Sequence, residues 1–328
     1  MNNTLITGAT GFLGSALLDK LKATDNVTLL VRPISSLEQQ VSLLNELHGS
    51  NVKIIYGDIC DYNLMCRVIA DNEITHVYHC AANSIVRICA NNPMGAYQTN
   101  VMGTVTLLEA IRTVGMNNIK SVVVSTSDKA YGHSPAPYNE DTPFSPKYTY
   151  ESTKSCQDIV AQNYFHNYGL PVKVVRCSNL YGPGDPNESR LIPNSIKKLM
   201  AGSRPVLYTG VADYQREFTY ISDAVNAFKL IGEESPPGEN YCVGSVDGPI
   251  KILDLAIKIS DTYHLVNDST SADEKVELVE RAANFKEIEI QSIDDTKLHG
   301  LGWNPHINLE EGLKRTILFY QEEELYNV

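Results

Sequence analysis

The stretch that decides the fold is residues 3–14, which read NTLITGATGFLG and lead into a helical pattern of apolar residues up to Leu21. Residues 3–7 are expected to form a strand, and the glycine-rich turn after it opens a helix. Such a turn lets the backbone approach a pyrophosphate at the helix N-terminus. The spacing is G-x-x-G-x-x-G. Its position between a leading strand and a helix favours dinucleotide binding over an ordinary tight turn.

Strands and helices alternate through the first half of the chain. We expect helices from about Pro93 to Val114 and from Tyr150 onward, and strands at 27–31, 52–56, 75–80, 121–124 and 172–176. This alternation predicts an α/β protein with a doubly wound parallel sheet. Residues 1–178 are therefore interpreted as a dinucleotide-binding domain.

The second half of the chain alternates less regularly. It has expected strands at 205–208, 216–220 and 241–244 and amphipathic helices at 250–260 and 309–323. We interpret residues 179–328 as a smaller C-terminal α/β lobe that binds substrate, with some segments returning to the sheet. The glycine- and proline-rich stretch 182–190 suits a substrate loop within it.

Composition narrows the class of protein. The 328 residues are 43% hydrophobic and 20% charged, as in globular proteins, and the net charge of −12 argues against a nucleic-acid-binding surface. There is no 18-residue apolar run and no signal-peptide pattern, so we expect a cytoplasmic protein that does not enter a membrane. The seven cysteines form no Cys-x-x-Cys, which favours reduced thiols and no metal site.

Polar side chains follow the strand that ends at Val124. The chain continues as STSDKAYG over residues 125–132, and a helix then opens with Tyr150 and Lys154. Spacing of four residues places Tyr150 and Lys154 on one helix face. A lysine cation favours the phenolate, so we expect a lowered pKa for Tyr150. That phenol would act as a base, with the Ser127 hydroxyl nearby to share a substrate hydroxyl.

The residue after the second expected strand helps to distinguish NAD from NADP. An acid at this position hydrogen-bonds the adenosine ribose and favours NAD. This chain has Arg32, followed by Ser35 and Ser36, a composition that can accept a 2′-phosphate, so we favour NADP over NAD. The alternative is a solvated surface arginine. Other cofactor contacts are expected from Gly8, Thr10, Gly11, Phe12, Leu13, Gly14, Asp58, Ile59, Ala81, Ala82, Tyr150 and Lys154.

Taken together, these segments resemble the extended short-chain dehydrogenases/reductases of the NAD-dependent epimerase/dehydratase family that act on nucleotide sugars. The matching pieces run in family order as TGATGFLG at 7–14, HCAA at 79–82, NVMGT at 100–104, Ser127 with Tyr150 and Lys154, NLYGP at 179–183, REFTYISD at 216–223 and LGW at 301–303. The resemblance implies a Rossmann fold, a tightly held nicotinamide cofactor and a homodimer formed through the Pro93–Val114 and Tyr150 helices. It implies that Asn83, Asn179, Leu191, Ile192, Arg216 and Tyr220 bind the nucleotide sugar.

Asp128 and Lys129 indicate which reaction follows. An Asp-Lys pair after the catalytic hydroxyl is similar to the CDP-glucose 4,6-dehydratase branch of the family. We therefore expect oxidation at sugar carbon 4, elimination of water across carbons 5 and 6, and a 4-keto-6-deoxy product. Asp128 would protonate the leaving hydroxyl, which requires a raised pKa, and Lys129 would act as the base at carbon 5 or hold the enolate.

Two other functions stay open. In a nucleotide-sugar 4-epimerase, Asp128 and Lys129 would be bystanders, either as an ion pair or as solvated loop residues. A non-catalytic NAD(P)-binding protein is the other alternative, because a fold does not fix a function. The chain also departs from the family pattern, with Glu217 where Asp is usual and only Arg281 and Lys286 as candidates for an arginine that precedes a late Asp. Recognition of the nucleotide base is therefore not assigned.

Overall fold

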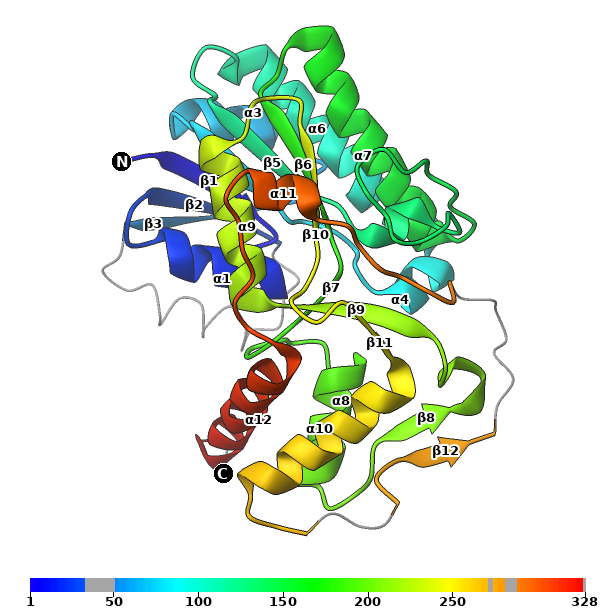
Figure 1. The fold of residues 1–328 in the computed structure, drawn as a ribbon. Coiled ribbons are helices and arrows are strands. Elements are labelled where there is room, and N and C mark those ends of the chain that lie inside the picture. Colours follow the sequence, from blue (N-terminus) through cyan, green and yellow to red (C-terminus); the bar gives the residue numbers. More distant parts are fainter. Residues whose placement is uncertain (33–50, 271–273, 281–287, 327–328) are drawn as a thin grey trace.

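The computed structural model describes residues 1–32, 51–270, 274–280 and 288–326. Its centre is a seven-stranded parallel sheet in the order β10-β6-β5-β4-β1-β2-β3 (Figure 1). The strands are β1 (Asn3–Thr7), β2 (Asn26–Val31), β3 (Val52–Tyr56), β4 (His76–His79), β5 (Ser121–Ser125), β6 (Val172–Cys177) and β10 (Asn240–Val243). The expected doubly wound parallel sheet is confirmed. Because β1 lies between β2 and β4, the strand order reverses there and leaves a crevice at the carboxyl ends of the strands.

Side chains on successive strand residues face opposite sides of the sheet, and both sides are buried. In β5, Val123 packs into one core with α1 (Phe12–Leu21) and α9 (Ile221–Glu234). Its neighbours Val122 and Val124 pack into the other core with α3 (Tyr62–Asp71), α6 (Gly103–Ala110) and α7 (Thr149–Tyr168). The sheet is thus covered by helices on both faces.

The helix expected at 93–114 is present but not uniform. It consists of α5 (Pro93–Tyr97), the π-helical segment η1 (Gln98–Met102), α6 and a second π-helical segment, η2 (Ile111–Gly115). A short helix that the sequence pattern did not indicate, α4 (Val86–Asn91), precedes it. The η1 segment places the buried Asn100 against the carboxyl end of β4, where its side chain accepts the N–H of Asn83 at 2.7 Å. The widened turns thus serve the site, as π-helical turns often do.

The second half of the chain builds a separate layer below the carboxyl ends of the strands (Figure 1). It contains the sheet β11-β9-β7, the pair β12-β8 and a set of packed helices. The elements are β7 (Asn179–Tyr181), α8 (Leu191–Met200), β8 (Val206–Tyr208), η4 (Thr209–Val211), β9 (Gln215–Tyr220), β11 (Pro249–Lys251), α10 (Ile252–Val266), β12 (Glu277–Val279) and α12 (Leu309–Tyr326). The short helix α11 (Thr296–Gly300) lies beside β10 instead (Figure 1). α9, β10 and α11 return to the main sheet, so three segments after residue 179 pack with the first half. The division at 178/179 stays a prediction.

Within the described residues, no helix has the length and apolar character needed to cross a membrane. The seven cysteines are all free thiols, and three of them, Cys89, Cys177 and Cys242, are buried.

Candidate active site

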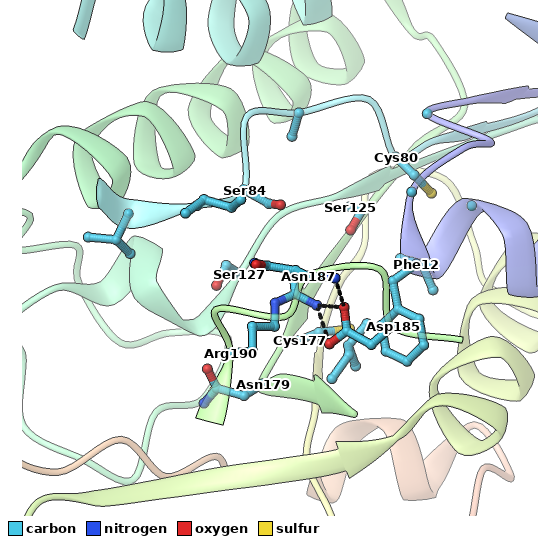
Figure 2. A pocket seen from close by; sticks show the side chains of 18 of the residues that line it. Phe12, Cys80, Ser84, Ser125, Ser127, Cys177, Asn179, Asp185, Asn187 and Arg190 are labelled. Carbon is cyan, nitrogen blue, oxygen red and sulfur yellow. Dashed lines mark hydrogen bonds and ion pairs between the residues drawn. The ribbon is translucent and has the colours of Figure 1, made fainter. Parts of the chain in front are cut away.

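A cavity of about 660 Å³ opens at the point where the strand order reverses, between the main sheet and the second layer (Figure 2). Its walls come from the glycine-rich turn, the carboxyl ends of β4 and β5, the start of α7, the segment 177–193 and Arg216. Ligands bind at this position in open α/β sheets. The volume is within the range of small-molecule and cofactor sites.

The glycine-rich turn fits a dinucleotide. A Cβ on Gly14 would lie 2.2 Å from the Gly8 carbonyl oxygen, and one on Gly8 would lie 2.7 Å from the backbone of Ala81. Gly8 also has a φ of +74°, a conformation that favours glycine. Gly11 is the N-cap of α1 and has no side chain to satisfy the first N–H groups of the helix. The helix N-terminus therefore offers N–H donors and its positive dipole end to a pyrophosphate.

Ser127, Tyr150 and Lys154 all line this cavity, as the sequence predicted. Lys154 is buried, and its ammonium donates to the Ser125 carbonyl at 3.0 Å and to Gln157 Oε1 at 2.8 Å. Burial lowers the pKa of Lys154 to about 8. Tyr150 is 7% exposed and lies beside Ser127, whose hydroxyl acts to lower the pKa of the phenol. One end of the cavity thus holds a hydroxyl, a phenol and a cation.

The expected lowering of the Tyr150 pKa is wrong for this structure. Burial raises that pKa above its usual value, the Ser127 hydrogen bond and the charge of Arg190 act to lower it, and the charge of Asp128 raises it. Because the Lys154 ammonium is held by Ser125 and Gln157, it is not among the leading influences on Tyr150. Sequence spacing placed the two residues on one helix but could not show where the ammonium points.

Asp128 and Lys129 lie on the short 3-10 helix η3 (Asp128–Tyr131), directly after Ser127. Asp128 is 1% exposed, and its Oδ1 accepts the Ser127 hydroxyl at 2.9 Å. Burial raises the pKa of Asp128, against the lowering effects of Lys129 and the Ser127 hydrogen bond. Lys129 lines the cavity, whereas Asp128 lies behind Ser127. The Ser127 Oγ also accepts the Lys129 N–H at 3.2 Å and caps η3.

The η3 segment is held firmly from behind. The Ala130 carbonyl accepts the Ser155 hydroxyl of α7 at 2.7 Å. The Tyr131 hydroxyl accepts an N–H of the buried Arg176 at 2.8 Å, and Arg176 is paired with Asp158 at 2.8 Å. Buried polar groups satisfied in this way rigidify their surroundings. The backbone that carries Ser127, Asp128 and Lys129 therefore has a fixed place at the end of β5.

Most of the residues expected at the site line the cavity. They are Ser127, Lys129, Tyr150 and Lys154, the six glycine-turn residues Gly8, Thr10, Gly11, Phe12, Leu13 and Gly14, together with Arg32, Ile59, Ala81, Ala82, Asn179, Leu191, Ile192 and Arg216. The residues Ser35, Ser36, Arg281 and Lys286 lie outside the described residues. The structure thus brings together segments that are more than 180 residues apart in the chain.

Four expected residues do not line the cavity. Besides Asp128, Asp58 accepts the Cys60 N–H at 2.8 Å in a turn after β3. Asn83 uses its amide to donate to the Gly95 carbonyl at 3.0 Å, which ties the end of β4 to α5. Tyr220 is buried beside Tyr181 and Gly312, with 5.5 Å between the two tyrosine ring centroids, in the contact with α12. These side chains support the walls of the cavity instead of forming them.

Several lining residues were not among the expected contacts. Arg190 donates to Asp185 at 3.0 Å, and Asp185 also accepts the Asn187 N–H at 3.0 Å (Figure 2). Ser84 lies just before α4, and Arg87 is in its first turn. The polar composition of 182–190 did indicate a substrate loop, but nothing in the sequence pattern indicated α4.

A doubly wound sheet with a glycine-rich turn where its strand order reverses, and a Ser–Tyr–Lys set across the cavity, define an extended short-chain dehydrogenase/reductase of the epimerase/dehydratase class. The chain belongs to the family described as GDP-mannose 4,6 dehydratase, whose model matches residues 5–316. It is 31% identical to the dTDP-D-glucose 4,6-dehydratase of Bos taurus over 97% of this chain and 88% of that protein. The resemblance expected from the sequence is confirmed.

Solved structures agree in fold. The dTDP-glucose 4,6-dehydratase of Streptomyces venezuelae, solved with NAD, has a TM-score of 0.86 at 26% identity and covers 99% of this chain and 98% of its own. The UDP-glucose 4-epimerase of Thermotoga maritima, solved with UDP-glucose, has a TM-score of 0.85 at 25% identity, with coverage of 98% and 99%. A dehydratase and an epimerase match equally well, so the fold does not separate the two reactions.

Proposed function

We propose that the chain is a nucleotide-sugar 4,6-dehydratase that converts a hexose nucleotide to its 4-keto-6-deoxy product. The observation that carries the proposal is the pairing of two sets of groups at the end of β5. Ser127, Tyr150 and Lys154 surround one end of the cavity, and Asp128 with a raised pKa stands beside Lys129 on the same backbone segment. An epimerase needs only the first set, whereas an elimination needs an acid and a base as well.

In the proposed reaction, Tyr150 takes the proton of the hydroxyl at sugar carbon 4, and Ser127 hydrogen-bonds the same oxygen. A bound nicotinamide supplies the hydride acceptor for carbon 4 and the hydride donor for carbon 6. The ketone acidifies the hydrogen at carbon 5. Lys129 removes that proton as the free amine, or holds the enolate by its charge as the ammonium. Because burial raises its pKa, Tyr150 starts as a neutral phenol, so its proton must first be released to solvent and the resulting phenolate then takes the proton of the carbon-4 hydroxyl.

Asp128 gives the departing carbon-6 hydroxyl its proton. Its carboxyl lies behind Ser127 with 2.9 Å between Oδ1 and Oγ, so we propose that the proton passes through the Ser127 hydroxyl. The serine accepts a proton from Oδ1 as it gives its own to the leaving oxygen, which becomes water. Burial supports this role, because it raises the pKa of Asp128 and favours the protonated acid.

We propose that Asn179, Leu191, Ile192 and Arg216 hold the nucleotide sugar. Arg216 is 6% exposed, lies on β9 and reaches the cavity wall, and its guanidinium donates to the Gln215 carbonyl at 2.8 Å. A guanidinium on a cavity wall can bind a diphosphate at two oxygens. The assay with different hexose nucleotides described below identifies which nucleotide base and which sugar are bound.

We propose that Arg32, at the end of β2 on the cavity wall, binds the adenosine ribose end of the dinucleotide and favours NADP. The relatives solved with NAD bind that form. Titration of the purified chain with each dinucleotide tests the choice. Replacing Arg32 with Ala should weaken NADP binding more than NAD binding, and an equal loss for both would contradict the assignment.

We also propose a homodimer through α5–α6 and α7. Met94, Met102 and Ile159 are 82%, 47% and 56% exposed on these elements, and exposed apolar side chains on neighbouring helices support an interface there. A cytoplasmic location and the absence of nucleic-acid partners stay predictions.

The deciding experiment incubates the purified chain with CDP-, UDP-, dTDP- and GDP-hexoses and analyses the products by mass spectrometry. A dehydratase gives a product lighter by one water that develops near-ultraviolet absorbance in alkali. Interconversion of two 4-epimers without loss of water would show an epimerase instead. No turnover of any member together with retained dinucleotide binding would favour the non-catalytic alternative.

A further inference from the structure

Gln291 joins Asp128 to Lys129, although it lies more than 160 residues later in the chain. Its side chain is fully buried. Its Nε2 donates to Asp128 Oδ2 at 3.1 Å, and its Oε1 accepts the Lys129 ammonium at 3.0 Å. One amide therefore contacts both groups that the elimination requires.

The chemistry of the partners fixes the orientation of this amide. An ammonium can only donate, so the oxygen of Gln291 must face Lys129 and its NH₂ must face Asp128. Asp128 Oδ2 accepts this N–H, which makes it the less favourable of the two oxygens for the acid proton while the bond is made. In the neutral acid the proton is then placed on Oδ1, and the 2.9 Å contact, in which the ionised carboxylate accepts the Ser127 hydroxyl, reverses so that Asp128 donates to the Ser127 oxygen.

The backbone around Gln291 is tied on both sides. Its N–H donates to the Gln215 carbonyl of β9 at 3.0 Å, and the following Ser292 carbonyl accepts the Tyr138 N–H at 2.8 Å. The Ile293 N–H donates to the buried Glu217 at 2.8 Å. The amide is therefore presented to η3 by a segment that is anchored to the second layer and to the 131–147 loop.

We propose that Gln291 is a positioning residue for the elimination step. It holds Asp128 and Lys129 in a fixed relation and directs the acid proton of Asp128 towards Ser127 and the cavity. This inference rests on the proposed dehydratase function. It assigns no contact with the sugar to Gln291, because Gln291 does not line the cavity.

The expected consequence is a change in one step only. Without the amide, oxidation at carbon 4 by Tyr150 and Ser127 should proceed within about threefold of the normal rate. Elimination should fall by about 10- to 100-fold, which is less than the loss of an acid or base itself. Reduced cofactor should then accumulate in a single turnover, with the KM changed less than about twofold.

The experiment uses Gln291→Met, which keeps the length of the side chain and removes both hydrogen bonds, and Gln291→Glu, which keeps an acceptor for Lys129 and loses the donor to Asp128. Stopped-flow absorbance of the reduced cofactor follows oxidation, and mass spectrometry follows loss of water. Tyr138→Phe is the matched control. It removes the hydroxyl that donates to the Ile290 carbonyl at 3.3 Å in the same segment, but leaves the amide of Gln291 in place.

The proposal is supported if reduced cofactor accumulates in both Gln291 variants while the ratio of oxidation to water loss stays normal in Tyr138→Phe. The proposal is overturned if folded Gln291 variants keep a normal ratio of oxidation to water loss, or if Tyr138→Phe shows the same defect. Either result would give Gln291 a purely structural role. If Gln291→Met does not fold, Gln291→Glu alone decides between these outcomes. A wild-type chain that never releases water refutes the dehydratase function itself, and the role of Gln291 with it.

Discussion

At the scale of single residues, the environment of Asp128 is the feature that most affects the chemistry. A carboxyl that is 1% exposed loses the hydration that stabilises its charge, and its pKa rises. The Ser127 hydroxyl and the Lys129 charge counter this rise without removing it. The same side chain on an exposed loop would be ionised at neutral pH and could not donate a proton.

Replacing Asp128 with Asn should therefore separate the two halves of the reaction. The amide is nearly isosteric but cannot give a proton, so water loss should slow by about 10²–10⁴-fold. Oxidation at carbon 4 should persist, and reduced cofactor should be visible by absorbance. Asp141→Asn, at an exposed position in the loop that follows, is the control and should leave both steps unchanged. If the Asp128→Asn enzyme loses water at a rate within a fewfold of wild type, Asp128 is instead a bystander, as in an epimerase.

At the scale of elements, the conformation of the turn between β1 and α1 depends on the close approach of the backbone at Gly14 to the backbone at Gly8. Gly14 has no room for a Cβ because the Gly8 carbonyl oxygen would lie 2.2 Å away. Only a shift of the helix N-terminus can relieve such a contact, since the neighbour is backbone. The glycines at 8 and 14 therefore decide where the N–H donors of α1 point.

Gly14→Ala should accordingly weaken dinucleotide binding by at least tenfold, as the helix N-terminus moves away from the pyrophosphate. Isothermal titration with NAD and NADP measures the loss. Gly300→Ala in α11 is the matched control, because a Cβ there meets no atom within 4 Å. Equal affinities for the two variants would mean that the turn does not hold the pyrophosphate.

The elements also show where sequence patterns are reliable. Strands β1 to β6 of the main sheet appear within a residue or two of the expected ranges, because apolar runs between polar turns are a local signal. The helix at 93–114 was expected as one regular element, yet η1 and η2 widen it. The widened turn at η1 accompanies the hydrogen bonds of Asn100 with Asn83 and Thr153. A local sequence pattern carries no information about such contacts.

At the scale of the whole molecule, Glu217 connects distant segments. Its carboxylate accepts the Ser245 N–H at 2.7 Å, the Ser245 hydroxyl at 3.1 Å and the Ile293 N–H at 2.8 Å. Burial, with a smaller effect of the Asp295 charge, raises the pKa of Glu217 from 4.5 to about 7. Glu217 is thus a buried acid on β9 that connects this strand to the final third of the chain.

This raised pKa predicts a pH dependence of stability. Between pH 4.5 and 7 the folded chain retains a proton on Glu217 that the unfolded chain has lost. The contribution of Glu217 to the free energy of unfolding is therefore complete below pH 4.5 and is lost as the pH rises through 7. From the size of the shift, it amounts to about 3 kcal/mol at most. In urea titrations, the stability of wild type relative to Glu217→Gln should fall across this range. A constant difference would contradict the raised pKa.

The proposed dimer gives a second prediction at the scale of the whole molecule. The Met102→Glu/Ile159→Glu double variant places charges on the exposed face of α7 and of the neighbouring η1 segment, where desolvation opposes association. Sedimentation equilibrium should show a monomer for this variant and a dimer for wild type. Leu265→Glu, 71% exposed on α10 in the other layer, should remain dimeric. A wild-type monomer at micromolar concentration would refute the dimer.

The sequence by itself determined the doubly wound sheet, the glycine-rich turn and the Ser–Tyr–Lys set, because each depends on local pattern or on fixed spacing along one helix. Tertiary structure decided the rest. It turned the Lys154 ammonium towards Ser125 and Gln157, placed Asp128 behind Ser127, and moved Asn83 and Tyr220 into supporting roles. It also brought Gln291 to Asp128 and Lys129. Hydrogen bonds and burial depend on which distant segments meet, and that information lies in the packing of the whole chain.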